Sequence, residues 1–444
     1  MSRYHSFYDT VDQIIHYGIE KGILHLNTGG APFNGTHLTL DDRPVINFGS
    51  CSYLGLEFDP RLKQGAKEAI DKYGTQFAES RAYVSLGLYG QLQSLLEEIF
   101  EAPCVITPTT TLGHIANIPV LVQQEDAVIM DQQVHNSVQT AVELVKAKGT
   151  HIELLRHNRM DLLEARIREL RGKYKKIWYM ADGVYSMFGD CIPIDTIYHL
   201  LNKYAELHLY VDDAHGMSIH GKNGRGFVLS QHAIHFKMVM ATSLNKAFAS
   251  GGGVVVYGDK ALARKVGNVG GPLLSSGPMQ PSALGAAIAA AKIHLSDEIT
   301  SLQDQLKDNL LFTTMLLKQH GLPLISVSGA AIFFVGVSLP KLGHNLVRRM
   351  LDKGYYLNLG VFPTVPMRQT GIRFTITRLH TFSEIANMIS TLAAEFPVAM
   401  QEEQITLEAI YKAFRVPAPE TAAWNQSVDR VLKQALDLQL FHYT

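Results

Sequence analysis

The sequence predicts an α/β protein with a large doubly wound domain and a smaller α+β domain. Short apolar runs alternate with longer stretches whose apolar residues recur at helical spacing. This order of strand, helix and strand is typical of a parallel sheet covered by helices on both faces. After Asp297 the alternation gives way to one long helical stretch followed by short strands, which indicates a second domain of different architecture.

The strands of the large domain are predicted from runs that are mostly continuous in apolar residues rather than alternating. Such runs are expected of parallel strands whose two faces are both buried. In a doubly wound sheet, ligands bind at the carboxyl ends of the strands, so polar residues that follow these runs are candidates for the site. The predicted strands are 127–131, 177–181, 207–211, 238–242 and 253–257.

Helices are predicted between these strands and in the second domain. Residues 160–173 carry apolar side chains at helical spacing, and 115–122, 196–206 and 302–319 have a similar pattern. Short strands of the second domain are predicted around 324–327, 332–337 and 373–377.

The end of the chain has a helical pattern of its own. Ile405, Ala409 and Ala413 follow helical spacing, and so does a second group from Trp424 to Ala435. Two prolines between the groups predict a stiff linker. The predicted organisation is an N-terminal segment (1–50), a large domain (51–295), a small C-terminal domain (296–397) and a helical extension (398–444).

The composition excludes several classes of protein. With 46% hydrophobic and 18% charged residues, the 444-residue chain is expected to be globular rather than disordered. Its net charge of −1 lacks the basic excess of a nucleic-acid-binding protein. No apolar run approaches the ~20 residues of a transmembrane helix, and the N-terminus lacks the pattern of a secretion signal. Three scattered cysteines, Cys51, Cys104 and Cys191, favour structural thiols in a reducing compartment, so we expect a cytoplasmic protein.

Polar residues follow two consecutive predicted strands. Strand 207–211 runs into Asp212, Asp213 and His215, a group that could form a metal site, a turn or a ligand-facing pair. Strand 238–242 is followed by Ser243 and Lys246 and then by a glycine run. A single lysine after a strand is usually a solvated charge. Here, however, one strand-helix-strand unit would bring it beside the acidic group.

Pyridoxal 5′-phosphate (PLP) is a cofactor whose chemical needs these residues meet. Its aldehyde needs a lysine amine such as Lys246 for a Schiff base, and its pyridine nitrogen needs a buried carboxylate such as Asp212. Its phosphate needs hydroxyls and backbone N–H groups at a helix N-terminus, which 109–114 would provide ahead of the predicted helix 115–122. His135, a few residues after strand 127–131, is a candidate for stacking on the ring.

With these motifs in order, the chain resembles the α-oxoamine synthase family of PLP-dependent enzymes. The resemblance spans about 47–390 and implies PLP fold type I, the aspartate aminotransferase-like fold. The matching segments are C-S-Y-L-G-L (51–56), S-R (80–81), L-G-H-I-A-N (112–117), D-Q-Q-V-H-N-S (131–137), H-N (157–158), D-G-V-Y-S-M-F-G-D (182–190), D-D-A-H-G (212–216), S-L-N-K-A-F (243–248), F-P-T-V-P (362–366), and Arg373 through H-T (380–381).

The resemblance implies roles for four catalytic residues. Lys246 would form the Schiff base and then serve as general base for the α-proton of the substrate. Asp212 would pair with the pyridine nitrogen, and His215 would hydrogen-bond the ring hydroxyl oxygen. His135 would stack on the ring and hydrogen-bond the substrate carbonyl as charge develops there.

The resemblance also implies further binding residues. Gly113 and His114 would direct backbone amides at the phosphate, although the ring of His114 could also contact the cofactor. Ser186 is predicted near the cofactor rather than in a packing role only, and Ser243 keeps the hydroxyl of the lysine motif.

Two further features of the family concern the partner subunit and the substrate. Ser275 and Ser276 resemble a hydroxyl pair that reaches the phosphate of the neighbouring subunit, so a homodimer with shared active sites is expected. Arg373 falls on the arginine that binds the carboxylate of the amino acid.

The sequence departs from the family pattern at several positions. Asp182 replaces a glutamate, Phe188 replaces an aspartate, Ser243 replaces a threonine, and His114 stands where an aromatic ring is usual. Gln93 is the best match for a histidine of the family. None of these changes removes the cofactor chemistry, but together they indicate a different substrate pocket.

The implied activity is that of a C-acyltransferase. An amino acid would condense with an acyl thioester, delivered by coenzyme A or an acyl carrier protein, to give an α-aminoketone, usually with decarboxylation. Transamination, or the chemistry of the related α-hydroxyketone autoinducer synthases, is the first alternative. A non-catalytic subunit is the second, and the presence of Lys246, Asp212, His215 and His135 disfavours it.

Overall fold

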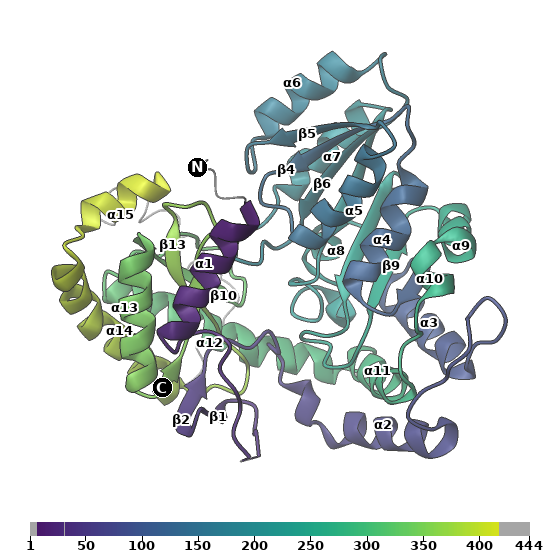
Figure 1. The fold of residues 1–444 in the computed structure, drawn as a ribbon. Coiled ribbons are helices and arrows are strands. Elements are labelled where there is room, and N and C mark those ends of the chain that lie inside the picture. Colours follow the sequence, from purple (N-terminus) through teal and green to yellow (C-terminus); the bar gives the residue numbers. More distant parts are fainter. Residues whose placement is uncertain (1–6, 31, 417–444) are drawn as a thin grey trace. The chain divides into compact units, whose positions relative to one another are not determined.

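The computed structural model describes residues 7–30 and 32–416, which form two compact units (Figure 1). The large unit consists of Leu54–Ser186 and Cys191–Gln303. The small unit contains the chain up to Tyr53, the short segment Met187–Asp190 and the chain from Asp304 onward. The predicted ranges placed boundaries at 50 and 295 and kept the first residues as a separate segment. In the structure that segment contributes strands to the small unit instead.

Seven strands form a mixed sheet in the described part of the large unit, in the order β3-β9-β8-β7-β6-β4-β5. Strands β5, β4, β6, β7 and β8 are parallel neighbours. The bounds are β3 Cys104–Thr107, β4 Ala127–Asp131, β5 His151–Leu155, β6 Ile177–Asp182, β7 Leu207–Asp212, β8 Met238–Ser243 and β9 Gly253–Tyr257. The five predicted strands are all present, whereas β3 and β5 were not predicted.

Strand β9 departs from the parallel arrangement that continuous apolar runs are expected to adopt. This strand pairs antiparallel with both β8 and β3. Only nine residues, 244–252, connect β8 to β9, and a parallel connection needs a crossover of about a dozen residues or more. All five residues of β9 are buried, so its continuous apolar pattern reports burial on both faces and not direction.

Helices cover the two faces of this sheet. Helices α4, α5, α9 and α10 pack on the face that presents Val128, Trp178 and Tyr210. Ile129, Tyr179 and Leu209 point to the opposite face and have no exposed surface, so that face is covered too. The helical segments of the large unit are η1 Leu56–Phe58, α2 Pro60–Tyr73, α3 Gly87–Phe100, α4 Thr110–Leu121, α5 Asn136–Lys146, α6 Met160–Leu170, α7 Ile194–Lys203, η2 Lys222–Gly224, α8 Phe227–Gln231, α9 Lys260–Val269, α10 Gly271–Ser275 and α11 Pro281–His294.

The small unit is an α+β arrangement with two small sheets. One has the order β10-β13-β12 and is antiparallel, and the other has the order β1-β2-β11. Its strands are β1 His37–Leu40, β2 Arg43–Asn47, β10 Ile332–Ser338, β11 Tyr355–Tyr356, β12 Asn358–Gly360 and β13 Thr370–Thr375. Its helices are α1 Phe7–Glu20, α13 Pro340–Asp352, α14 Phe382–Glu403 and α15 Leu407–Phe414, and α12 Glu298–Gln319 begins in the large unit and continues into it.

Two predictions for the small unit need correction. The expected strand around 324–327 is only an isolated bridge between Leu324 and Val335, because Pro323 has no N–H for a ladder and Gly329, at φ +77°, turns the chain. The expected boundary at 397 lies inside α14, which starts with a capping box between Thr381 and Glu384.

Part of the predicted C-terminal extension can be compared with the structure. The first group of apolar residues, around Ala409 and Ala413, falls on α15. The second predicted helix, from Trp424 to Ala435, lies outside the described residues. Within 7–30 and 32–416, no helix is long and apolar enough to span a membrane.

Candidate functional site

A cavity of about 220 Å³ opens at the carboxyl ends of β6, β7 and β8 in the large unit. This is the edge where a doubly wound sheet binds ligands. The cavity is lined by Thr109, Thr110, Thr111, His135, Ser137, Asp182, Val184, Asp212, Ala214, His215, Ser243, Asn245 and Lys246. The four predicted catalytic residues are all among them.

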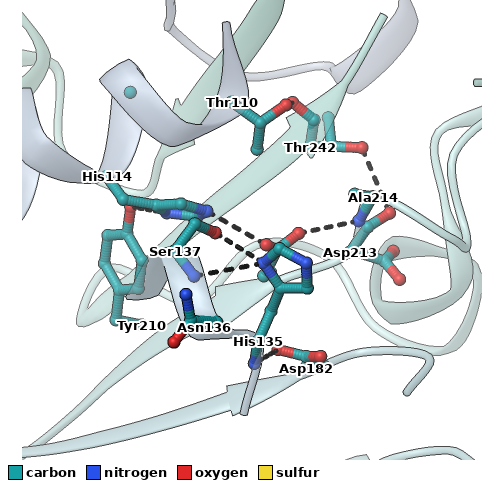
Figure 2. A network of polar contacts seen from close by, with 12 residues as sticks. Thr110, His114, His135, Asn136, Ser137, Asp182, Tyr210, Asp213, Ala214 and Thr242 are labelled. Carbon is teal, nitrogen blue, oxygen red and sulfur yellow. Dashed lines mark hydrogen bonds and ion pairs between the residues drawn. The ribbon is translucent and has the colours of Figure 1, made fainter. Parts of the chain in front are cut away.

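Asp212 is the last residue of β7 and is 5% exposed. Its Oδ1 accepts a hydrogen bond from the Ala214 amide at 3.0 Å, and its Oδ2 lies 3.0 Å from Nε2 of His114 (Figure 2). Burial alone would raise the pKa of Asp212. The hydrogen bond with His114 and the nearby charge of Lys246 outweigh burial and lower this pKa below its usual value. This lowered pKa favours an ionised carboxylate in the lining of the cavity.

Lys246 follows β8 in the chain and reaches the same cavity. Its Nζ lies 2.8 Å from Nε2 of His215, which belongs to the turn after β7. Strands β7 and β8 are parallel neighbours, so their carboxyl ends bring the two segments together. The predicted juxtaposition of Lys246 with the Asp212–His215 group is thus present. The metal alternative for this group has no support, because no cluster of three His, Cys, Asp or Glu side chains suited to a metal ion occurs in the described part of the chain.

His135 stands between β4 and α5, at the N-cap of that helix. Its Nδ1 accepts a hydrogen bond from the Ser137 amide at 3.3 Å and lies 2.6 Å from the Ser137 hydroxyl. Its own amide donates to Oδ1 of Asp182 at 3.0 Å (Figure 2). Burial lowers the pKa of His135, helped by Lys246 and His114 and opposed by Asp212. A neutral imidazole with a fixed orientation therefore lines the cavity.

Two aspartates lie side by side on neighbouring strands at this site. Asp182 ends β6 and is the register partner of Asp212 on β7. Burial and the charge of Asp212 raise the pKa of Asp182 well above its usual value. Like charges directly opposite on neighbouring strands are unfavourable, and the opposite directions of the two pKa shifts favour the negative charge on Asp212 rather than on Asp182.

The start of α4 differs from the prediction. The helix begins at Thr110, not Ile115, because the side chain of Thr109 caps it by accepting from the Leu112 amide at 3.1 Å. The Gly113 amide consequently donates to the Thr109 carbonyl at 2.9 Å inside the helix. The backbone N–H groups of a first turn lack intrahelical acceptors, and here they belong to Thr110 and Thr111, which line the cavity.

Several other predicted binding residues do not line this cavity. Gly113 and His114 lie buried behind it in α4, and Ser186 lies beyond Val184 in the segment after β6. Ser275 ends α10, and the Ser276 hydroxyl donates to the Pro272 carbonyl. A contact of Ser275 or Ser276 with a neighbouring subunit remains a prediction.

Arg373 lies on β13 in the small unit and is 7% exposed. Its Nη1 donates to Oδ1 of Asn358 at 3.2 Å, and its Nη2 lies 3.9 Å from Sγ of Cys51. The guanidinium is therefore held by its own unit in a defined position.

The residues missed by sequence reasoning are neighbours of those it found. Ser137, Val184 and Asn245 line the cavity. All three fall inside the motifs that match the family, one to two residues from His135, Asp182 or Lys246, and this proximity in sequence was the available signal. Which of them faces the cavity depends on the turn after each strand.

Comparison with known proteins agrees with these features. The family model described as aminotransferase class I and II matches residues 43–392. The 8-amino-7-oxononanoate synthase of Fervidobacterium nodosum is 32% identical over 394 residues, covering 87% of this chain and 96% of that protein. The enzyme of the same name from Symbiobacterium thermophilum is 33% identical, covering 80% and 89%.

Solved structures show the same fold. A serine palmitoyltransferase from S. paucimobilis superposes with a TM-score of 0.81 at 21% identity, covering 88% of this chain and 98% of that one. The 8-amino-7-oxononanoate synthase of Francisella tularensis gives a TM-score of 0.66 at 21% identity, covering 81% and 99%. The fold is therefore PLP fold type I. The sheet has the expected mixed order, a lysine and an aspartate follow or end adjacent strands, and relatives above 30% identity match most of the chain. The chain therefore belongs to the aminotransferase class I and II family and, within it, to the α-oxoamine synthases.

Proposed function

We propose that Lys246 is the residue that binds PLP in this α-oxoamine synthase, with Asp212 at the pyridine nitrogen and the first turn of α4 at the phosphate. As a member of the family, the protein uses PLP to condense an amino acid with an acyl thioester. The assignment of roles to individual residues is our proposal.

The donor set of the cavity fits PLP. A buried, ionised Asp212 suits a protonated ring nitrogen, and Lys246 offers an amine. Thr109, Thr110 and Thr111 offer hydroxyls and a helix N-terminus to a phosphate. The serine palmitoyltransferase from S. paucimobilis, which shares the fold, has PLP bound. We place the phosphate at Thr109–Thr111 and no longer at the amides of Gly113 and His114, because the Gly113 amide is engaged within the helix.

When bound, PLP supplies an electron-withdrawing ring that stabilises negative charge at the α-carbon of the amino acid. The Nζ atom of Lys246 takes the α-proton, and His215, at 2.8 Å, holds that atom in place. Neutral His135 donates a hydrogen bond from Nε2 to the thioester carbonyl oxygen as negative charge develops there, since its Nδ1 already accepts from Ser137. Arg373, positioned by Asn358, binds the carboxylate of the amino acid.

The contact between Lys246 Nζ and His215 Nε2, beside Asp212, is the observation that carries this assignment. A direct assay follows thiol release when the purified, PLP-loaded protein receives glycine, alanine or serine with acyl-coenzyme A of several chain lengths. We expect thiol release that depends on the amino acid and matches the α-aminoketone formed, with none above background for Lys246→Ala. Keto-acid formation without thiol release would instead establish an aminotransferase. If the protein neither reacted nor bound the cofactor, a non-catalytic subunit would be favoured.

We also propose a homodimer in which Ser275 and Ser276 of one subunit reach the phosphate of the other. Both residues lie at the end of α10, outside the lining of the cavity in their own chain, which is consistent with a role across an interface. The amino acid and the acyl thioester are the only further partners that we propose. A cytoplasmic location stays a prediction from the cysteine content.

A further inference from the structure

His114 connects α4 to the carboxylate of Asp212 through its buried imidazole ring. The residue has no exposed surface. Its Nε2 lies 3.0 Å from Oδ2 of Asp212, and its Nδ1 lies 2.8 Å from the hydroxyl of Tyr210 (Figure 2). The Ala214 amide occupies the other carboxylate oxygen. Each carboxylate oxygen of Asp212 thus has its own donor, and both nitrogens of the His114 ring are hydrogen-bonded.

Tyr210 and Asp212 form a rigid frame for this ring. They are two residues apart on β7, so their side chains project from the same face of the strand, which is the face that α4 covers. Tyr210 has no exposed surface, and its ring meets that of His114 edge to face, with centroids 5.7 Å apart. A buried ring in this frame has little freedom to leave Asp212.

The hydrogen bonds define which nitrogen of His114 carries the proton. An ionised carboxylate only accepts, so Nε2 must donate to Asp212. Among the described residues, Nδ1 of His114 is the only acceptor that the Tyr210 hydroxyl has, so Nδ1 accepts from Tyr210. Burial raises the pKa of Tyr210 well above its usual value, so its hydroxyl keeps the proton that it donates. The direction of donation therefore runs from Tyr210 through His114 to Asp212.

Other titratable groups surround Asp212. Asp182 faces it from β6, Asp213 follows it in the turn, and Lys246 and His135 approach it from the cavity. Lys246 and His135 become occupied when cofactor and substrate bind, whereas His114 lies behind the carboxylate, away from the cavity lining. His114 is thus the side-chain donor to Asp212 that cofactor and substrate leave in place, beside the backbone amide of Ala214.

We propose that His114 is a positioning residue that aims the Asp212 carboxylate and keeps the negative charge on Asp212 rather than on the paired Asp182, with Tyr210 fixing its tautomer. This inference rests on the proposed function, because Asp212 is the group that we place at the pyridine nitrogen of PLP. A charged Asp212 keeps that nitrogen protonated, so His114 would control the electron-withdrawing power of the ring without touching it.

Three variants separate the contributions. His114→Phe keeps a planar ring and removes both nitrogens, so Asp212 loses its donor. His114→Gln keeps an N–H donor near the position of Nε2 and is the matched control. Tyr210→Phe removes only the hydroxyl and leaves the ring packing. The readout is the ¹⁵N chemical shift of PLP labelled at the ring nitrogen, measured in each holoenzyme across pH, together with the dissociation constant of PLP.

We expect the ring nitrogen of wild type and of His114→Gln to stay protonated to high pH. In His114→Phe it should lose its proton at least about one pH unit lower, with PLP bound about 10-fold more weakly or worse, as expected for a lost hydrogen bond to a charge. Tyr210→Phe should give a smaller shift in the same direction. The kcat value should fall more than KM changes, because Arg373 and the substrate contacts are untouched.

Two outcomes would overturn the proposal. One is a His114→Phe holoenzyme with the wild-type ¹⁵N titration, even if its Tm is lower. If that variant fails to fold, the other is a Tyr210→Phe holoenzyme whose ¹⁵N titration and PLP affinity are those of wild type. Failure of the proposed function looks different, because wild type itself would then bind no PLP at Lys246 or show an unprotonated ring nitrogen.

Discussion

Asp213 follows Asp212, the aspartate that we place at the pyridine nitrogen, but its own contacts are with the protein backbone. The residue is completely buried, and its Oδ2 accepts from the Val228 amide at 3.1 Å. Its Oδ1 has no hydrogen-bond partner in the part of the chain that the structure describes. A Cβ added at Gly183 or Gly216 would lie only 2.3 Å from that oxygen, so these glycines are needed to make room for the carboxyl group.

The protonation of Asp213 should make stability depend on pH. Burial, together with the charge of Asp212, raises the pKa of Asp213 to about 8 in the folded state. The native state then holds one more proton than the unfolded state between the unfolded pKa, near 4, and pH 8. The free energy of unfolding should therefore fall as pH rises through this window, by ~1.4 kcal/mol per pH unit from this group.

Asp213→Asn removes this titration while keeping an acceptor for Val228. Urea unfolding of the apoprotein at pH 6 and pH 8 should show a smaller loss of stability for the variant than for wild type, while other groups titrate alike in both. Equal losses in the two proteins would show that Asp213 is already ionised at pH 6.

At the scale of one element, the N-cap of α4 determines which backbone amides line the cavity. Thr109 starts the helix at Thr110, which brings the first-turn amides to the cavity and turns the ring of His114 toward Asp212. Sequence reasoning found the threonine-rich segment but started the helix five residues later. A run of three threonines offers three possible caps, and only the backbone geometry selects Thr109.

Removing this cap should affect both stability and cofactor binding. Thr109→Ala should cost about 1 kcal/mol of stability and weaken PLP binding, because the first turn would fray at the proposed phosphate site. Thr406→Ala is the matched control, since Thr406 caps α15 in the same way by accepting from the Ala409 amide at 3.2 Å. Fluorescence titration with PLP checks this prediction. An equal change of PLP affinity in both variants, or none in Thr109→Ala, would contradict a phosphate site at this turn.

The apolar pattern of a strand reports its burial, so buried strands could be predicted from the sequence better than exposed ones. Apolar runs located β4, β6, β7, β8 and β9 to within a residue, because every residue of these strands is buried except His208 of β7, which is partly buried. Strand β5, at the edge of the sheet, has only one fully buried residue and gave no such run. The direction of a strand depends on the connection that precedes it, so the apolar pattern of β9 does not reveal that this strand is antiparallel. The side-chain pairing of His114 with Asp212, 98 residues apart, has no counterpart in local sequence.

At the scale of the whole molecule, the proposed chemistry draws on more than one part of the chain. Lys246, Asp212 and His215 belong to the large unit, whereas Arg373 belongs to the small unit. Ser275 and Ser276 lie outside the cavity of their own chain. The proposed homodimer accounts for the position of these two serines, because each active site would then use residues of two chains.

Subunit complementation tests this sharing of residues. Lys246→Ala and the double variant Ser275→Ala/Ser276→Ala should each have low activity alone. After the two are unfolded together and refolded as a 1:1 mixture, random pairing should restore about a quarter of wild-type activity, because half the dimers are hybrids and each hybrid has one intact site. Wild type refolded in parallel is the control. No recovery in the mixture would place the serines in the same site as their own Lys246, or outside any site.

The attachment of PLP to Lys246 is the claim on which the rest depends, and one measurement addresses it directly. The holoenzyme is reduced with borohydride, digested and mapped by mass spectrometry, with Lys246→Ala as control. We predict a reduced cofactor adduct on Lys246 in wild type and none on any lysine of the variant, which should also lack the absorbance that borohydride abolishes. An adduct on another lysine, or the same absorbance change in Lys246→Ala, would contradict the account.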